Sequence, residues 1–315
     1  MAADTDLDRP IVGAAQSSPE VPAPRWKLAA LAALLLILVV QLFLMLRPAS
    51  PEEQVRRAME ELHLSGATIA IGNVGETRPR LVTIDAEPDE FYRYYSLSKP
   101  ITAALVLDQV SKGRLSLDQQ IAGASVRQIL QHRGGWDREM AGDPVLERSD
   151  HSPCTRLPPP TARQFEPGTR FVYSNIGYCL LGAAVERASG QAYPDLARAI
   201  LPETRAMRYD PWLGPAGGWS GDAATYFRFA ARPLPAMTAA RPVGETATEY
   251  FGLGWKVHAD GSLSHFGAYR TGDYALVLRQ GTRITLALFH GNPPDYEGAR
   301  DHLRGPLTAL SDSID

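Results

Sequence analysis

Hydrophobic residues recur along this chain with the spacings of both helices and strands. Helical patterns occur at residues 52–63, 175–190 and 297–310, and strand patterns occur at 67–74, 80–84, 250–258, 273–278 and 283–289. Gly281 and Thr282 supply a tight turn between the last two strands. Strands at both ends of the chain, with helices between and after them, predict an α/β (α+β) domain in which helices flank an antiparallel sheet.

A further helix is predicted directly after Ser96. Nearly every residue from Ile101 to Leu107 is apolar, and Gly113 supplies a stop signal. A helix that is apolar on all sides is typical of the interior of a domain. By contrast, residues 137–168 are rich in proline and indicate a long functional loop rather than a sheet element.

The N-terminal part of the chain has a different pattern. Residues 28–46 are apolar except for Gln41, and the run is long enough to span a bilayer. Basic residues are nearly balanced on its two sides and leave the orientation open. The chain is thus predicted to contain a disordered tail at 1–25, a transmembrane anchor at 26–47, a linker at 48–51 and a globular domain at 52–315; the side of the membrane on which the tail lies, taken as cytoplasmic, depends on the family resemblance described below.

Composition narrows the function classes. The chain has 315 residues, of which 44% are hydrophobic, and its formal net charge is −3. It is long enough for one large domain with a second lobe. The near-neutral charge and the lack of a basic cluster argue against a nucleic-acid partner. Neither the cysteines nor the histidines have the spacing of a metal site, so we expect no metal.

Ser96 and Lys99 place a hydroxyl and an amine on one helix face, because residues three apart are neighbours there. A serine hydroxyl is a poor nucleophile until a neighbouring base removes its proton. Lysine can act as that base when burial lowers its pKa, and the apolar helix predicts such burial. The spacing alone also suits a helix cap at Ser96 and a solvated charge at Lys99.

Tyr173 and Asn175 stand between a Glu-Pro-Gly turn and an apolar helix. A phenol beside a cation can give up its proton more easily, so Tyr173 could relay protons. The amide of Asn175 could bond both a substrate amide and the lysine. The alternative is an ordinary half-buried tyrosine followed by a helix cap.

His265, Gly267 and Ala268 lie near a strand edge. A glycine there lets a substrate backbone approach closely, and the Ala268 N–H could donate to a developing oxyanion. His265 could hold a carboxylate or assist proton transfer. A structural strand histidine is the alternative.

Three motifs, taken in order, resemble those of the serine β-lactamase and penicillin-binding protein superfamily: Ser96-x-x-Lys99, Tyr173-x-Asn175 and His265-x-Gly267. The similarity is to the class C-like branch, which includes D-Ala-D-Ala carboxypeptidases and esterases. It covers roughly residues 52–312, with matching segments at 113–118, 129–137, 165–168 and 252–255.

The resemblance implies a β-lactamase/transpeptidase-like fold, with an all-α lobe beside the sheet, the active site between them, and no metal or organic cofactor. Ser96 would be the acylated nucleophile, while Lys99 and Tyr173 would share the general-base and proton-return roles. The substrate would be bound by Asn175, His265 and Gly267, and the oxyanion hole would be formed by the N–H groups of Ser96 and Ala268.

The implied protein is a serine hydrolase acting on small-molecule or peptidoglycan-derived substrates: a D-alanyl peptide, a β-lactam, a small ester or a D-amino-acid amide. Because cell-wall substrates lie outside the cytoplasmic membrane, the resemblance implies a periplasmic domain on a single-pass inner-membrane anchor. In that oxidising space Cys154 and Cys179 could form a disulfide, or remain two buried thiols. A non-catalytic receptor for peptidoglycan or penicillin is the alternative function.

Some residues depart from the family pattern or compete with it. His265 stands where many members have lysine and would hold a carboxylate less firmly, which weakens the case for penicillin turnover. Phe266 replaces a small hydroxyl residue, removes a donor and narrows the cleft. Ser220 nearly forms a nucleophile elbow, but Asp222 replaces its second glycine. Ser98, two positions from Ser96 on a helix, is expected to point elsewhere.

Overall fold

The computed structural model describes residues 25–270 and 272–314. The chain divides into two units between Ala49 and Ser50. The smaller unit contains helix α1 (Arg25–Leu46). The predicted tail at residues 1–25 lies outside the described residues except for its last position.

In the part of the chain that the structure describes, no helix combines the length and the apolar character needed to cross a membrane. A single span requires about 20 consecutive, mainly apolar residues. This finding contradicts the predicted anchor at 26–47 and the single-pass inner-membrane location with a periplasmic domain. We therefore withdraw both.

The larger unit is built on a seven-stranded antiparallel sheet with the strand order β2-β1-β12-β11-β10-β9-β8. Its strands are β1 (Leu64–Asn73), β2 (Arg80–Ile84), β8 (Tyr250–Phe251), β9 (Lys256–Val257), β10 (Leu263–Ala268), β11 (Asp273–Gln280) and β12 (Arg283–Gly291). The predicted antiparallel sheet flanked by helices is confirmed.

The single strand predicted at 250–258 is instead a hairpin. Gly254 has a φ of +87°, in the left-handed region that favours glycine, and the chain reverses there. As a result β8 pairs back on β9, with Tyr250 opposite Val257.

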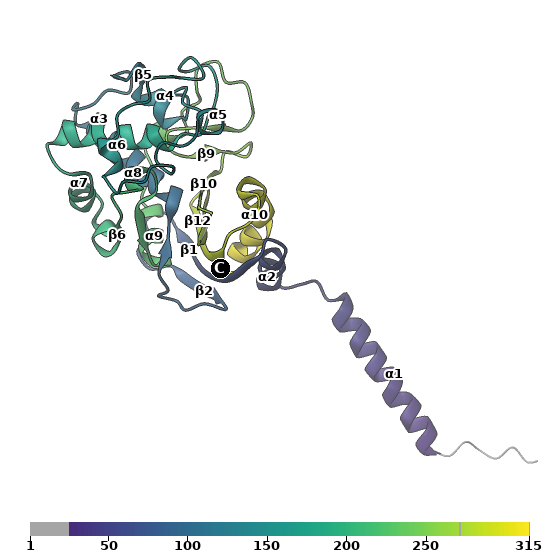
Figure 1. The fold of residues 1–315 in the computed structure, drawn as a ribbon. Helices are drawn as coiled ribbons and strands as arrows, with labels where there is room; N and C mark the ends of the chain where they lie inside the picture. The colour runs from purple at the N-terminus through teal and green to yellow at the C-terminus, as the bar shows by residue number, and fades with distance from the viewer. Residues whose placement is uncertain (1–24, 271, 315) are drawn as a thin grey trace, which may run out of the picture. The chain divides into compact units, whose positions relative to one another are not determined.

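Two hydrophobic cores lie on opposite faces of the sheet. Along β11, Leu276 and Leu278 face one core, while Ala275 and Val277 face the other, as strand alternation requires. The first core is closed by helices α2 (Pro51–Glu61) and α10 (Tyr296–Asp312), which pack together (Figure 1).

The remaining helices lie on the other side of the sheet (Figure 1). They are α3 (Ser98–Ser111), α4 (Val126–Leu130), α5 (Arg138–Ala141), α6 (Asn175–Ser189), α7 (Tyr193–Ile200), α8 (Gly214–Gly217) and α9 (Ala223–Ala230), with short 3-10 helices η1 (Tyr95–Leu97), η2 (Cys154–Arg156), η3 (Pro202–Ala206) and η4 (Ala236–Ala239). This region also carries the strand pair β4 (Gln120–Ile121) and β5 (Ala124–Ser125) and a small sheet of β3 (Tyr92–Arg93), β7 (Trp219–Gly221) and β6 (Arg208–Tyr209), so it is not strictly all-α.

Helix α3 is an interior helix, as its apolar sequence predicts. The side chains of Lys99, Ile101 and Leu105 are fully buried. The residues at 137–168 contain only the short helices α5 and η2 and no strand, in agreement with the predicted loop.

Candidate active site

Ser96 lies on the turn that leads from β3 into α3. The turn is the 3-10 helix η1, and α3 itself begins at Ser98, so Ser96 precedes the helix rather than belonging to it. Tyr95 has a φ of +46°, a conformation that non-glycine residues adopt rarely. The i, i+3 relation is preserved across the turn, and Lys99 Nζ lies 3.0 Å from Ser96 Oγ.

The Lys99 amine is fully buried and donates to two further oxygens, Asn175 Oδ1 and the Ala216 carbonyl, each at 2.7 Å. Burial lowers its pKa well below the usual value, and the nearby charge of Arg138 acts in the same direction. In its neutral form this amine would have two N–H groups and one lone pair. With the two oxygen acceptors taking the N–H groups, the lone pair would be left for the Ser96 hydroxyl.

Tyr173 Oη donates a 2.7 Å hydrogen bond to Ser96 Oγ, and its ring centroid lies 4.8 Å from Lys99 Nζ. Burial raises the pKa of Tyr173 to about 12, although the Ser96 bond opposes this. The charge of Arg138 lowers this pKa, as expected of a neighbouring cation, but burial outweighs it. Tyr173 is a phenol that holds its proton near neutral pH.

Asp143 is a site residue that the sequence did not reveal. Its buried carboxylate accepts a 2.6 Å hydrogen bond from Asn175 Nδ2, so the amide oxygen of Asn175 faces Lys99. The same carboxylate raises the pKa of Lys99, against the larger effect of burial. Asp143 lies in the proline-rich loop, where no local pattern distinguishes it from other acidic residues.

His132 was also missed, although its segment took part in the family resemblance. Its ring stacks on Tyr173 with centroids 4.2 Å apart, and its Nδ1 accepts a bond from the Ser174 N–H at 3.1 Å. Burial lowers its pKa well below the usual value, and Lys99 adds to the effect. A neutral imidazole thus stacks against one face of the Tyr173 ring.

Gly267 brings β10 against the turn that carries Ser96. A Cβ at this position would lie 2.0 Å from the Tyr94 carbonyl oxygen and 2.9 Å from the Ser96 nitrogen. The close approach that we predicted for a substrate backbone is therefore used by the protein's own backbone. It places Ala268 beside Ser96, and the two residues line one cavity.

His265 is buried on β10 at 4% exposure, and its Nδ1 lies 2.8 Å from the Phe266 carbonyl oxygen. Burial lowers its pKa to about 3, and the charge of Lys99 contributes. A neutral imidazole cannot supply the cation that would hold a carboxylate, which removes one of the two roles predicted for it.

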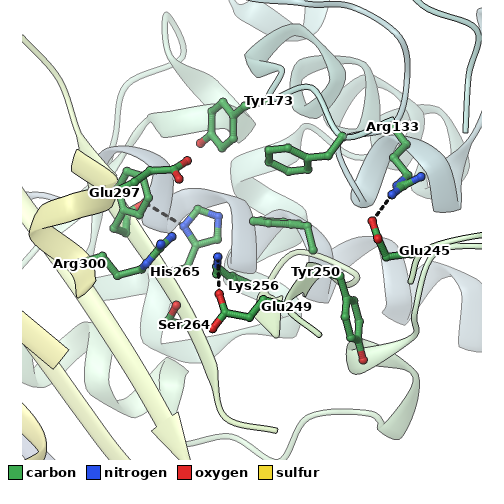
Figure 2. A pocket seen from close by; sticks show the side chains of 13 residues that line it. Arg133, Tyr173, Glu245, Glu249, Tyr250, Lys256, Ser264, His265, Glu297 and Arg300 are labelled. Atoms are coloured by element: carbon green, nitrogen blue, oxygen red, sulfur yellow. Dashed lines mark hydrogen bonds and ion pairs between the residues drawn. The ribbon is translucent and has the colours of Figure 1, made fainter. Parts of the chain in front are cut away.

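Two cavities meet at this site. A cavity of about 730 Å³ contains Ser96 and Ala268, and a smaller one of about 270 Å³ contains His265 (Figure 2). Both cavities are lined by Phe171, Tyr173, Phe266 and Glu297. The aromatic side chain at 266 thus contributes to the walls of both cavities.

Other serines do not compete with Ser96. Ser98 is buried and accepts a hydrogen bond from the Trp219 N–H. Ser220 lies in β7, where it pairs with Arg93 of β3 and Arg208 of β6. Ser264 Oγ lies 2.7 Å from His258 Nε2, whose ring also contacts Glu249, but the serine is fully buried. In the described chain, no cluster of three or more His, Cys, Asp or Glu side chains is placed to hold a metal ion.

Cys154 and Cys179 form a disulfide, which resolves the alternative left open by the sequence. The bond joins η2 in the proline-rich loop to α6. The segment that it closes contains Tyr173 and Asn175, so the second motif lies within a covalent ring.

Comparison with known proteins agrees with the motifs. The family model described as "Beta-lactamase" matches residues 52–202, slightly less than half of the chain. The chain is similar to members of the serine β-lactamase and penicillin-binding protein superfamily. The resemblance predicted from the three motifs is confirmed, together with the β-lactamase/transpeptidase-like fold and the assignment to a family of serine hydrolases.

Three of the proteins similar to this chain differ in description. A probable fimbrial assembly protein, FimD of Dichelobacter nodosus, is 37% identical over 123 residues, which are 34% of this chain and 31% of that protein. The esterase EstB of Burkholderia gladioli is 27% identical over 189 residues, 48% of each. The solved D-amino acid amidase of Ochrobactrum anthropi has a TM-score of 0.64 at 19% identity, covering 84% of this chain and 99% of that one. The chain spans between about a third and a half of the length of these curated relatives.

Proposed function

We propose that this domain is a serine hydrolase that forms an acyl-enzyme at Ser96 and acts on small amide or ester substrates. The observation that carries the proposal is the continuous chain Tyr173–Ser96–Lys99, with oxygen contacts of 2.7 and 3.0 Å. One neighbour of the serine is a buried amine with a lowered pKa, and the other is a phenol that keeps its proton. A base and an acid therefore flank one hydroxyl.

In the first step, Ser96 Oγ attacks the substrate carbonyl carbon while its proton passes to Lys99 Nζ. The resulting oxyanion accepts hydrogen bonds from the N–H groups of Ser96 and Ala268. As the bond to the leaving group breaks, Tyr173 supplies the proton to that group and regains one from Lys99. Water then attacks the acyl-enzyme by the same route and releases the acid.

The substrate class follows from the neutral His265 and the aromatic Phe266. Neither side chain supplies the positive charge or the hydroxyl that would hold a carboxylate beside Ser96. We therefore propose that esters and amides without a carboxylate are turned over faster than penicillins. EstB and the D-amino acid amidase are named for ester and amide chemistry, which supports this choice.

The proposal is tested with the full chain, 4-nitrophenyl acetate and a fluorescent penicillin. Ser96→Ala and Lys99→Met are expected to lower kcat/KM for the ester by at least about 10²-fold, the usual contribution of acid–base catalysis. Lys112→Met removes an exposed lysine of the same region and is the matched control. Intact mass should show an acyl adduct on Ser96. Ester turnover that survives Ser96→Ala, or binding of penicillin without any adduct, would contradict the proposal and favour a receptor.

A further inference from the structure

The smaller cavity has the chemistry of a binding site in its own right. Aromatic rings form much of its wall, with Phe171 and Phe251 centroids 5.8 Å apart and Phe251 set edge-on to His265 at 5.6 Å. Most of the remaining lining is charged, and Figure 2 shows Glu297, Arg300, Lys256 and Glu249 near the ring of His265. The cavity shares four lining residues with the nucleophile's cavity.

His265 presents an unused acceptor to this cavity. Its Nδ1 faces the Phe266 carbonyl, which can only accept, so Nδ1 carries the proton of the neutral ring and Nε2 carries the lone pair. Nε2 is buried and has no hydrogen-bond partner among the described residues. An unpaired buried acceptor is unfavourable, and a ligand N–H would satisfy it.

Glu297 supplies negative charge at the same place. The cavity is lined by three cations, and each has a carboxylate of its own: Arg133 with Glu245, Lys256 with Glu249, and Arg300 with Asp301. Glu297 has no ion pair within residues 25–270 and 272–314, and in Figure 2 its side chain points from α10 toward Tyr173 and His265. The local charge is therefore left net negative by one carboxylate.

A group bound between these side chains needs N–H donors for His265, positive charge for Glu297 and tolerance of aromatic faces. A protonated amine has all three properties, since aromatic rings attract cations as well. A carboxylate has none of them, because it donates no hydrogen bond and is repelled by Glu297.

We propose that the smaller cavity is a subsite for an ammonium group carried by the substrate, with His265 Nε2 and Glu297 as its acceptors. The assignment rests on the proposed function, since the ammonium group belongs to a substrate whose carbonyl lies at Ser96. It narrows the substrate class to esters or amides that carry a free amine.

The test measures binding to the full-chain Ser96→Ala protein, so that no turnover is required. Benzylamine, benzyl alcohol and benzoate differ in charge but little in shape, and their affinities are compared by calorimetry at pH 7. Benzylamine is expected to bind at least about tenfold more tightly than benzoate, and Glu297→Gln is expected to abolish most of the difference. Glu60→Gln, an exposed carboxylate on α2, is the matched control.

A second readout follows His265 itself. In ¹⁵N-labelled protein, the chemical shift of Nε2 is expected to be that of an unprotonated nitrogen. This shift should change when benzylamine is added. It should not change when benzyl alcohol is added to the Glu297→Gln variant. Equal affinities for the three probes, or a proton on Nε2, would overturn the subsite. An inactive wild-type enzyme that still selects benzylamine would instead refute the hydrolase proposal and leave the subsite standing.

Discussion

Asn175 and Asp143 are joined by a 2.6 Å hydrogen bond between two buried side chains. Since only the Nδ2 end of the amide can donate to a carboxylate, this bond determines that Oδ1 faces the Lys99 amine at 2.7 Å. The loop residue Asp143 thus controls the orientation of the base through Asn175, without contacting Ser96. It is a positioning residue, and its charge and its shape can be tested separately.

Replacing Asp143 with alanine is expected to lower kcat/KM by about 10²-fold, the cost of misplacing a catalytic group by about 1 Å. Asp143→Asn keeps an acceptor for Asn175 and should lose much less. It removes a charge that raises the pKa of Lys99, so the acidic limb of the pH profile should move to lower pH. Asp89→Asn, on an exposed loop, is the control. An unchanged acidic limb in Asp143→Asn would argue against Lys99 as the base.

Replacing Tyr173 with phenylalanine is expected to lower kcat by about 10²–10⁴-fold, because the leaving group loses its proton donor. The donor must be protonated, so activity should fall as pH rises through the pKa of Tyr173. That pKa is about 12, and the wild-type profile should therefore have no alkaline limb below about pH 10. Activity that instead rises with pH through a step near pH 8, and loses this step in Tyr173→Phe, would show that the residue acts as a phenolate base.

Gly267→Ala is expected to disturb the contact between β10 and η1, since the added methyl would meet the Tyr94 carbonyl at 2.0 Å. Such overpacking costs about 1–3 kcal/mol in unfolding free energy, and activity should fall with it. Gly305→Ala on α10 is the matched control, because a methyl group there meets nothing within 4 Å. Its effect on the unfolding free energy should be small, because Pro306 follows it in the helix and disfavours a Cβ on the preceding residue, which offsets the gain from replacing glycine. Denaturant unfolding of both variants checks the pair, and equal stabilities would refute the contact.

Reduction of the Cys154–Cys179 disulfide is expected to destabilise the domain by about 3 kcal/mol, the value for a closed segment of this length. Tyr173 and Asn175 lie inside the ring, so ester turnover should decline at a lower temperature in reductant. Cys154→Ser with Cys179→Ser should behave like the reduced protein and no longer respond to reductant. A Tm that is the same with and without reductant would contradict this.

Local pattern was sufficient for strands β1, β2, β11 and β12, for the interior helix and for the three motifs. In the segments at 67–74 and 80–84, apolar residues either alternate with polar ones or follow one another. This pattern can be read in the sequence because it reflects burial of the strand faces against helices. Ser96 and Lys99 were recognisable because residues three positions apart lie on the same face of a helical turn, which brings their side chains together across η1. These features depend on neighbours in the chain, and the structure changed them little.

The remaining features depend on contacts between distant segments. Asp143 matters only because α6 brings Asn175 to it, and His132 only because Tyr173 stacks on its ring. The neutral state of His265 and the raised pKa of Tyr173 follow from burial, which the sequence around each residue does not display. The hairpin at Gly254 was missed because a strand can continue through a single glycine, so the glycine alone did not indicate a turn.

The pairing of β1 with β12 has a consequence for synthesis of the chain. Leu64 lies opposite Gly291, so β1 can pair with β12 only after the last strand of the described chain has been made. Ser96 and Lys99 leave the ribosome early, whereas the β10 wall, β12 and α10 follow much later. Contacts of such long sequence separation form slowly. A nascent chain that ends before residue 291 therefore carries its nucleophile without a working enzyme around it.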